Sequence, residues 1–139
     1  MRVVLANRST SKTVLAGDAV QQYKTAEALR QKGVIVETSE GSLPSLKQID
    51  LVHLFNIIPV EETYLLFLEA KKAGVPVVLS PIYWEPDEFL MYAYSDHGSA
   101  FKDWWIKTHD QRSRLLRESN MILPNGQAEL NLLKDTFGD

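Results

Sequence analysis

Short apolar runs recur along this chain, and each of them stops abruptly at a polar or turn-forming residue. Four of these runs are 2–6 before Asn7, 51–55 before Asn56, 75–79 before Ser80 and 121–123 before Pro124. Strands that are buried on both faces read as unbroken apolar runs, and their alternation with helical patterns is typical of a parallel sheet. Because ligands of such sheets bind beyond the carboxyl ends of the strands, the pattern also predicts where a binding site lies.

The segments between these strands carry the periodicity and the end signals of helices. Apolar residues at helical spacing follow Asp18, which we interpret as an N-cap, and Gly33 supplies the stop after about Lys32. A second helix is expected from Pro59 to Gly74, with acidic residues in its first turn and lysines in its last. The pattern also predicts a short strand over 34–38, a long insertion over 84–119 and a last helix over 129–137.

We therefore predict an α/β fold, an open Rossmann-like sheet of five parallel strands with helices on both faces. The 139 residues are enough for a single domain, 1–139, that buries about two thirds of the surface of the unfolded chain. The first strand begins at Arg2 and no apolar run approaches a membrane span, so we expect a cytoplasmic protein without a signal peptide.

The composition excludes several classes of site. The chain has no cysteine, which excludes disulfides and cysteine metal ligands, and its three scattered histidines favour no metal site. The net charge of -3 gives no general attraction to nucleic acid. A dinucleotide fingerprint needs three spaced glycines where only Gly17 stands, and no phosphate loop is present. A phosphoacceptor receiver domain needs carboxylates where this chain has Asn7 and Asn56.

The aromatic residues are unevenly distributed. Eight of the thirteen lie between Tyr83 and Trp105, including all three tryptophans, and this cluster begins at the carboxyl end of the fourth strand. Aromatic faces at that position suit the apolar faces of sugars or the acyl part of a lipid. The other interpretation is that the insertion builds a small core of its own, since aromatic rings pack as readily as they bind ligands.

Four segments taken together point to a known family. They are 17–21 with 24–26, 50–56, 76–84 and 123–129. In this order and spacing they resemble the N-terminal domain of family-4 retaining glycosyltransferases, sugar-nucleotide-dependent enzymes of the GT-B fold. The resemblance covers essentially the whole chain. It implies that this domain holds the acceptor, and that a C-terminal domain of similar size, absent from this chain, holds the nucleotide sugar.

The resemblance implies transfer of a sugar from a nucleotide sugar to a carbohydrate or lipid acceptor, by an enzyme of which this chain alone is inactive. The nucleotide sugar is then a co-substrate of the complete enzyme, and no cofactor or metal is expected on this chain. A donor-phosphate contact is implied at Gly17, which keeps one of the two glycines of the family loop. Acceptor contacts are expected at the strand ends: Asn56, Ser80, Tyr83, Trp84 and Asn125. The family histidine after the fourth strand is missing from 80–82, so the sequence names no catalytic residue.

Other interpretations of the same residues stay open. The missing histidine and donor domain also fit a non-catalytic Rossmann-like binding or interaction domain. A peripheral membrane module is a third interpretation, based on the residues Lys102, Lys107, Arg112, Arg114 and Arg117 with Phe101, Trp104, Trp105 and Ile106. Gly17 alternatively serves only the turn into its helix, Asn125 is interpreted as a helix cap, and His53 as a hydrogen-bonded core residue.

Overall fold

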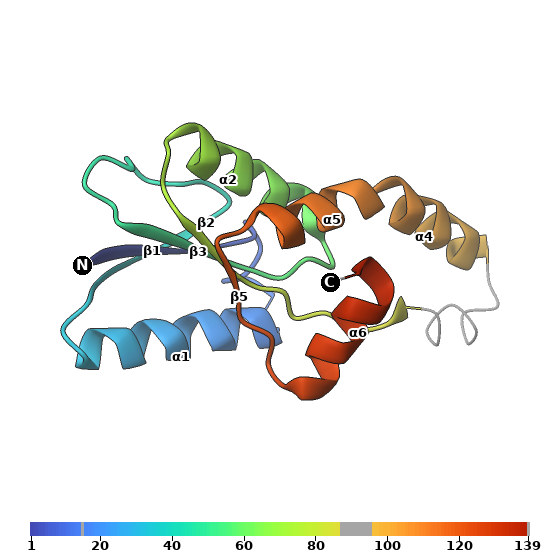
Figure 1. The fold of residues 1–139 in the computed structure, drawn as a ribbon, viewed down its shortest axis with the longest axis horizontal. Coiled ribbons are helices and arrows are strands. Elements are labelled where there is room, and N and C mark those ends of the chain that lie inside the picture. The colour runs from blue at the N-terminus through green and yellow to red at the C-terminus, as the bar shows by residue number, and fades with distance from the viewer. Residues whose placement is uncertain (15, 87–95, 139) are drawn as a thin grey trace.

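Figure 1 shows the fold as a computed structural model, which describes residues 1–14, 16–86 and 96–138. In chain order its elements are β1 (Arg2–Asn7), α1 (Gly17–Gln31), β2 (Ile35–Glu40), β3 (Leu51–Phe55), α2 (Val60–Lys72), β4 (Val77–Ser80), α4 (Asp96–Lys107), α5 (His109–Glu118), β5 (Met121–Ile122) and α6 (Gln127–Phe137). Within the described ranges, no helix is long and apolar enough to cross a membrane.

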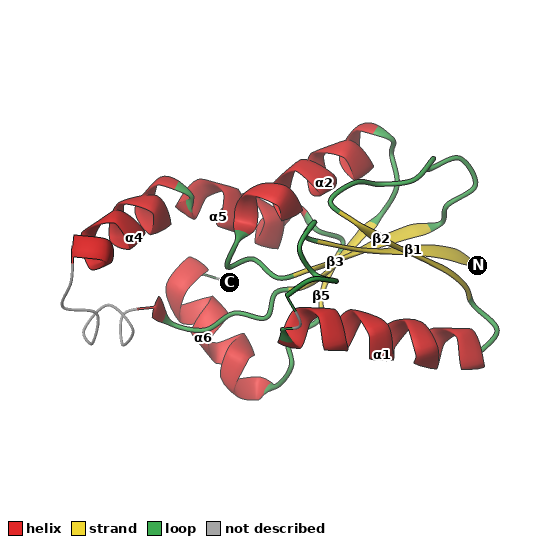
Figure 2. Ribbon diagram, turned by 180° about the vertical axis from the view of Figure 1, so that it is seen from behind, coloured by secondary structure: helices red, strands yellow, loops and turns green. Residues whose placement is uncertain are grey.

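The strands form one sheet in the order β2-β1-β3-β4-β5, and every neighbouring pair is parallel. This confirms the predicted open parallel sheet, which Figure 2 shows from behind. The chain first steps from β1 to β2 on one side and then crosses to β3 on the other side of β1. The strand order therefore reverses between β1 and β3, and in open α/β sheets such a reversal marks the crevice where ligands bind.

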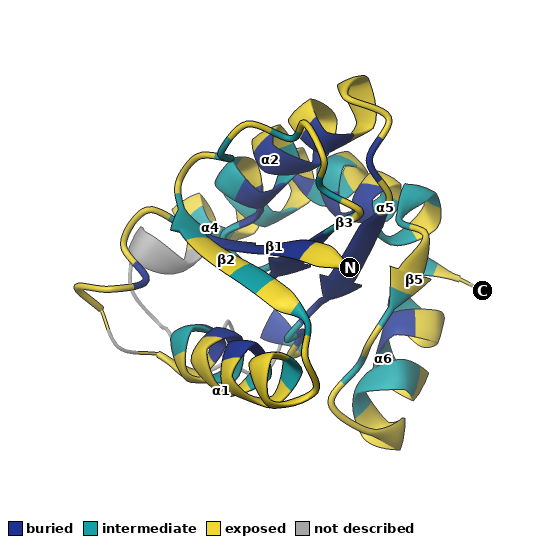
Figure 3. Cartoon of the chain, turned by 90° about the vertical axis from the view of Figure 1, so that its left-hand side faces the viewer, coloured by how far each residue is buried: buried dark blue, intermediate teal, exposed yellow. Residues whose placement is uncertain are grey.

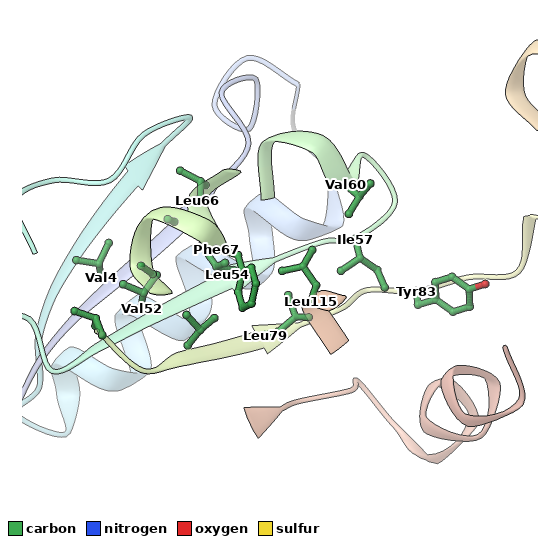
Figure 4. Close-up of a cluster of buried hydrophobic side chains, with 14 of the residues drawn as sticks. Val4, Val52, Leu54, Ile57, Val60, Leu66, Phe67, Leu79, Tyr83 and Leu115 are labelled. Carbon is green, nitrogen blue, oxygen red and sulfur yellow. The ribbon is translucent and has the colours of Figure 1, made fainter. Parts of the chain in front are cut away.

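Helices cover both faces of the sheet, with α1 and α6 on one side and α2 and α5 on the other (Figure 3). The side chains of β1 alternate between these layers. Val3 and Leu5 belong to one buried cluster with Ala26 of α1, whereas Val4 joins a larger cluster with Phe67 of α2. Figure 4 shows the larger cluster, in which residues of the sheet pack against α2. Burial on both faces explains why the strands read as unbroken apolar runs.

Two predicted helix caps are wrong. α1 begins at Gly17 and is flanked by Ala16, so Asp18 lies inside the first turn rather than at the N-cap. α6 begins at Gln127 and is flanked by Gly126, so Asn125 lies one residue outside the cap position. An acidic residue in the first turn of each helix bonds outside the helix. Asp18 of α1 accepts from Arg8, and Glu129 of α6 accepts from the backbone N–H of Asn125.

The insertion after β4 folds as α4 and α5, and its residues 87–95 lie outside the described part of the chain. Figure 1 shows α5 beside α2, with α4 extending away from the sheet. The rings of Phe101, Trp104 and Trp105 pack together, and Trp105 stacks on Tyr83 with 6.0 Å between ring centroids. Phe101, Trp104 and Trp105 therefore build a small core with Tyr83, in line with the second interpretation, whereas Trp84 is 44% exposed.

Arg112 of α5 is the largest fully buried side chain among the described residues, and its side-chain exposure is close to zero. Its Nε donates to the carbonyl of Ile57 at 2.8 Å, and its Nη2 donates to the carbonyl of Ile58 at 2.8 Å. Its Nη1 donates to Thr108 Oγ1 at 2.7 Å and to the Trp105 carbonyl at 3.2 Å. These bonds tie α5 and the end of α4 to the connection between β3 and α2.

The guanidinium of Arg112 lies 3.7 Å from the centroid of the Trp105 ring, so its charge also meets an aromatic face. Burial lowers the pKa of Arg112 to about 10, although the negative charge of Glu61 acts to raise it. Because Arg112 is inside the fold, it does not belong to the surface on which the membrane interpretation placed it. The exposed cations of that interpretation are Lys102, Lys107, Arg114 and Arg117.

We expect Arg112→Met to lower the free energy of unfolding by about 3 kcal/mol, because it leaves several buried carbonyl oxygens without donors. Arg112→Lys should recover only part of this loss, since one ammonium cannot replace the planar fork. Urea unfolding followed by circular dichroism measures both effects. The control is Arg114→Met on the same helix, an exposed residue paired with Glu118, for which we expect a much smaller loss because solvent screens the pair. Equal losses for the two methionine variants would contradict the structural role of Arg112.

Candidate functional site

A cleft of about 560 Å³ opens at the carboxyl edge of the sheet, where the strand order reverses between β1 and β3. Its walls are the loop after β1, the first turns of α1 and α2, the connection from β3 to α2, and the segment after β4. The lining residues are Arg8, Thr10, Val14, Ala16, Gly17, Asp18, Asn56, Ile58, Pro59, Glu61, Glu62, Ile82 and Trp84. The cleft therefore lies where the strand pattern predicts a ligand site.

An ion pair closes the wall between β1 and α1. Arg8 donates from Nε to Asp18 Oδ2 at 2.7 Å and from Nη2 to Asp18 Oδ1 at 3.1 Å. Asn56 Nδ2 donates to the same carboxylate at 3.3 Å. Burial acts to raise the pKa of Asp18, but the hydrogen bonds from Arg8 and Asn56 and the charge of Arg8 outweigh it, and the pKa lies below its usual range. Asp18 is therefore ionised at neutral pH, and it joins the ends of β1 and β3 to α1.

Two residues of the lining have left-handed backbone conformations. Asn56 has a φ of 72°, and its Oδ1 accepts the N–H of Ile58 at 2.9 Å, a short turn that suits asparagine. Ile82 has a φ of 50°, which is unusual for a β-branched residue and costs about 1–3 kcal/mol. Strain of this kind concentrates at ligand sites, where the surrounding structure holds it in place.

The loop after β1 is fixed to α2 from the other side. The backbone N–H and the Oγ of Ser9 donate to Glu62 at 2.7 and 2.9 Å. Gly41, with a φ of +71°, packs under this loop, and a Cβ added there would lie 2.8 Å from the Cβ of Ser9. Glu61 accepts the indole N–H of Trp104. Both glutamates thus keep defined positions at the rim of the cleft.

The structure brings three of the predicted site residues together. Gly17, Asn56 and Trp84 all line the cleft, although they lie in the segments that follow three different strands. Trp84 is 44% exposed, so part of its indole is accessible to a ligand. A Cβ added at Gly17 would meet nothing within 4 Å, and the backbone at this position is therefore open to close approach.

The other predicted acceptor residues lie elsewhere. Ser80 is 1% exposed, with its Oγ 2.9 Å from His53 Nε2. Tyr83 is buried, and its ring packs against Trp105 and, edge to face, against Phe137. Asn125 is exposed beside α6. Residues 83 and 84 point in different directions, which places one ring in the core and the other at the cleft.

His53 occupies the buried position that we inferred for it. It is 5% exposed, stacks on Phe55 with ring centroids 4.3 Å apart, and shares a hydrogen bond with Ser80. Burial lowers the pKa of His53 to about 4, so the imidazole is neutral at physiological pH. The residue supports the centre of the sheet beneath the cleft and has no direct access to it.

Several lining residues were not identified from the sequence. Arg8 stood in a polar loop without a recognisable pattern, and its partner Asp18 was interpreted as a cap. Glu61 and Glu62 were assigned only to the helix dipole, although their place at the start of α2 follows directly from the predicted strand end. That position was the signal that could have identified them.

No protein-family model and no curated protein matches the sequence of this chain. The function is therefore argued from the cleft and from the residues that line it.

We expect the stability of the domain to fall as the pH drops from about 6.5 to about 4, because the unfolded chain binds a proton at His53 more readily than the folded one. The contribution of His53 to the free energy of unfolding is fully present above the pKa of the unfolded chain. Its complete loss on acidification amounts to about 3 kcal/mol. Urea midpoints across this range measure it. His53→Gln should flatten the slope whatever its effect at neutral pH, whereas His109→Gln leaves His53 in place and should preserve it. An unchanged slope in His53→Gln would contradict the assignment.

Proposed function

We propose that this chain is the acceptor-binding N-terminal half of a glycosyltransferase of GT-B architecture, similar to the family-4 retaining enzymes. The complete enzyme transfers a sugar from a nucleotide sugar, held by a C-terminal domain, to a carbohydrate or lipid acceptor. The absence of cysteine fits a reducing compartment, and the proposal includes a cytoplasmic location.

The observation that carries this proposal is the composition of the cleft at the strand reversal. A sugar has apolar C–H faces and a rim of hydroxyl groups, so its site needs an aromatic face and several hydrogen-bonding groups. Among the residues that line the cleft are Trp84, whose indole is partly exposed, and Glu61 and Glu62, whose carboxylates can accept hydrogen bonds. Its volume of about 560 Å³ is that of a small-molecule site.

The rigid connection after β3 orients these groups. Asn56 bonds both to Asp18 and to the backbone of Ile58, and Thr63 Oγ1 donates to the carbonyl of Asn56 at 2.8 Å. The first turn of α2, which carries both glutamates, is thereby held in a fixed relation to β3. In this proposal Gly17 contributes an open stretch of backbone on the side that faces the donor.

One observation favours the alternative, a binding domain without chemistry. The charged pair in the cleft wall, Arg8 and Asp18, is closed on itself, and Arg8 further donates to Thr10 and to the carbonyl of Val14. Neither charge is placed to act on a bound ligand. A binding domain would show the same sugar affinity as the acceptor half of an enzyme, but no transfer in any combination with a donor domain.

We expect Trp84→Ala to weaken the binding of mono- and disaccharides by about three- to tenfold, because the aromatic contact is worth about 0.5–1.5 kcal/mol. Amide chemical shifts of the cleft residues, followed during titration, measure the affinity and report folding at the same time. The control is Tyr23→Ala, which removes an exposed ring of α1 that is 62% exposed and is not part of the cleft lining. Equal weakening by the two substitutions, or none by Trp84→Ala, would count against the site.

Nucleoside diphosphates and nucleotide sugars should bind this chain no more tightly than about millimolar, roughly -4 kcal/mol. The reason is that the donor of a GT-B enzyme lies between two domains, and one wall exposed to water lacks the preorganised groups of the other. Calorimetry measures this directly. Micromolar binding would show a complete nucleotide site on this chain and would contradict the assignment to an acceptor half.

A further inference from the structure

The cleft has an unusual balance of charge. Among the described residues that line it, Arg8 is the single basic side chain, whereas Asp18, Glu61 and Glu62 are acidic. The guanidinium of Arg8 binds Asp18 in a bidentate fashion and donates to Thr10 as well. Its side chain is only 12% exposed. The cation is therefore committed to the wall of the cleft and is not available to an incoming anion.

The two glutamates differ from Asp18 because neither forms an ion pair among the described residues, although the charge of Arg8 acts on Glu62 and that of Arg112 on Glu61. The partners of Glu62 are the N–H and hydroxyl of Ser9, and Glu61 accepts from the indole of Trp104. These donors are neutral. With three carboxylates and one guanidinium in its lining, the cleft keeps an excess of negative charge.

The starts of the two helices that face the cleft also disfavour an anionic ligand. A helix N-terminus attracts anions through its free N–H groups and its dipole. Here each N-terminal turn carries its own carboxylates, Asp18 in α1 and Glu61 with Glu62 in α2. The negative charge of these carboxylates opposes the attraction of an anion to either helix start.

We propose that the cleft selects a hydroxyl-rich ligand that is uncharged or positively charged, such as a hexose or an amino sugar, and rejects phosphorylated sugars. This rests on the proposed function, since it names the class of acceptor moiety that the same site takes. An ammonium group near Glu61 and Glu62 gains Coulomb energy, and a phosphate loses it, while the indole of Trp84 contacts the ring in each case.

Three ligands with the same ring test this selection: glucosamine, glucose and glucose 6-phosphate, titrated at about pH 6, where the amine is protonated. Amide shifts of the cleft residues measure each affinity at low salt and again at about 1 M salt. We expect glucosamine to bind about fivefold more tightly than glucose, and glucose 6-phosphate at least fivefold more weakly than glucose. High salt should bring the three affinities together.

Glu62→Gln removes one charge and keeps groups that can bond to both atoms of Ser9, so it should reduce the preference for glucosamine to about twofold. Glu69→Gln makes the same chemical change on the exposed surface of α2, away from the cleft, and should leave the preference intact. The salt dependence of the unaltered chain provides the same information if Glu62→Gln does not fold.

The outcomes separate the two proposals. Equal affinity for the three ligands, or strongest binding of glucose 6-phosphate, would overturn the charge selection and leave the sugar site standing. If none of the three ligands changes the chemical shifts of the cleft amides, the acceptor site and the charge selection are both overturned. A preference for glucosamine that survives both high salt and Glu62→Gln would show that the glutamates are not its cause.

Discussion

The structure depends on one buried charge, the guanidinium of Arg112. A charge removed from water is unfavourable unless polar groups surround it, and here these groups come from separate parts of the chain. The carbonyls of Ile57 and Ile58 belong to the connection after β3, whereas the Trp105 carbonyl and Thr108 belong to the end of α4 and the start of α5. Arg112 is satisfied only when these segments meet, so its burial requires the packing of the insertion on the sheet.

The same connection forms one wall of the cleft. On its inner side Arg112 holds two consecutive carbonyls, and on its outer side the side chain of Asn56 reaches Asp18, which Arg8 holds in turn. The left-handed backbone of Asn56 persists because both sides are fixed. The position of the first turn of α2, and therefore of the glutamates, follows from these contacts. The rigidity of the proposed site is thus a consequence of how the insertion is anchored.

The sequence predicted the parallel sheet, its helices on both faces and the edge at which the cleft opens, because periodicity and strand ends are local signals. It did not predict which of two adjacent aromatic residues is buried, since Tyr83 and Trp84 differ only in the direction each takes after β4. The burial of Arg112 was not predicted either, because two of its partners are backbone carbonyls more than fifty residues away. The ion pair of Arg8 and Asp18 was not predicted because the loop that brings the two side chains together has no recognisable sequence pattern.

The stability of the two helices and the charge of the cleft have a common origin. Acidic residues in a first turn stabilise a helix through its dipole, and the sequence supplies them at the start of both α1 and α2. In a parallel α/β sheet those first turns are also the walls of the ligand crevice. The carboxylates that favour these helices therefore set the electrostatic character of the site. Asp18 is paired with Arg8, whereas the hydrogen-bond donors to Glu61 and Glu62 are neutral, so the lining of the cleft keeps an excess of negative charge. Both first turns that line the cleft carry acidic residues, and their negative charge opposes the binding of an anion there.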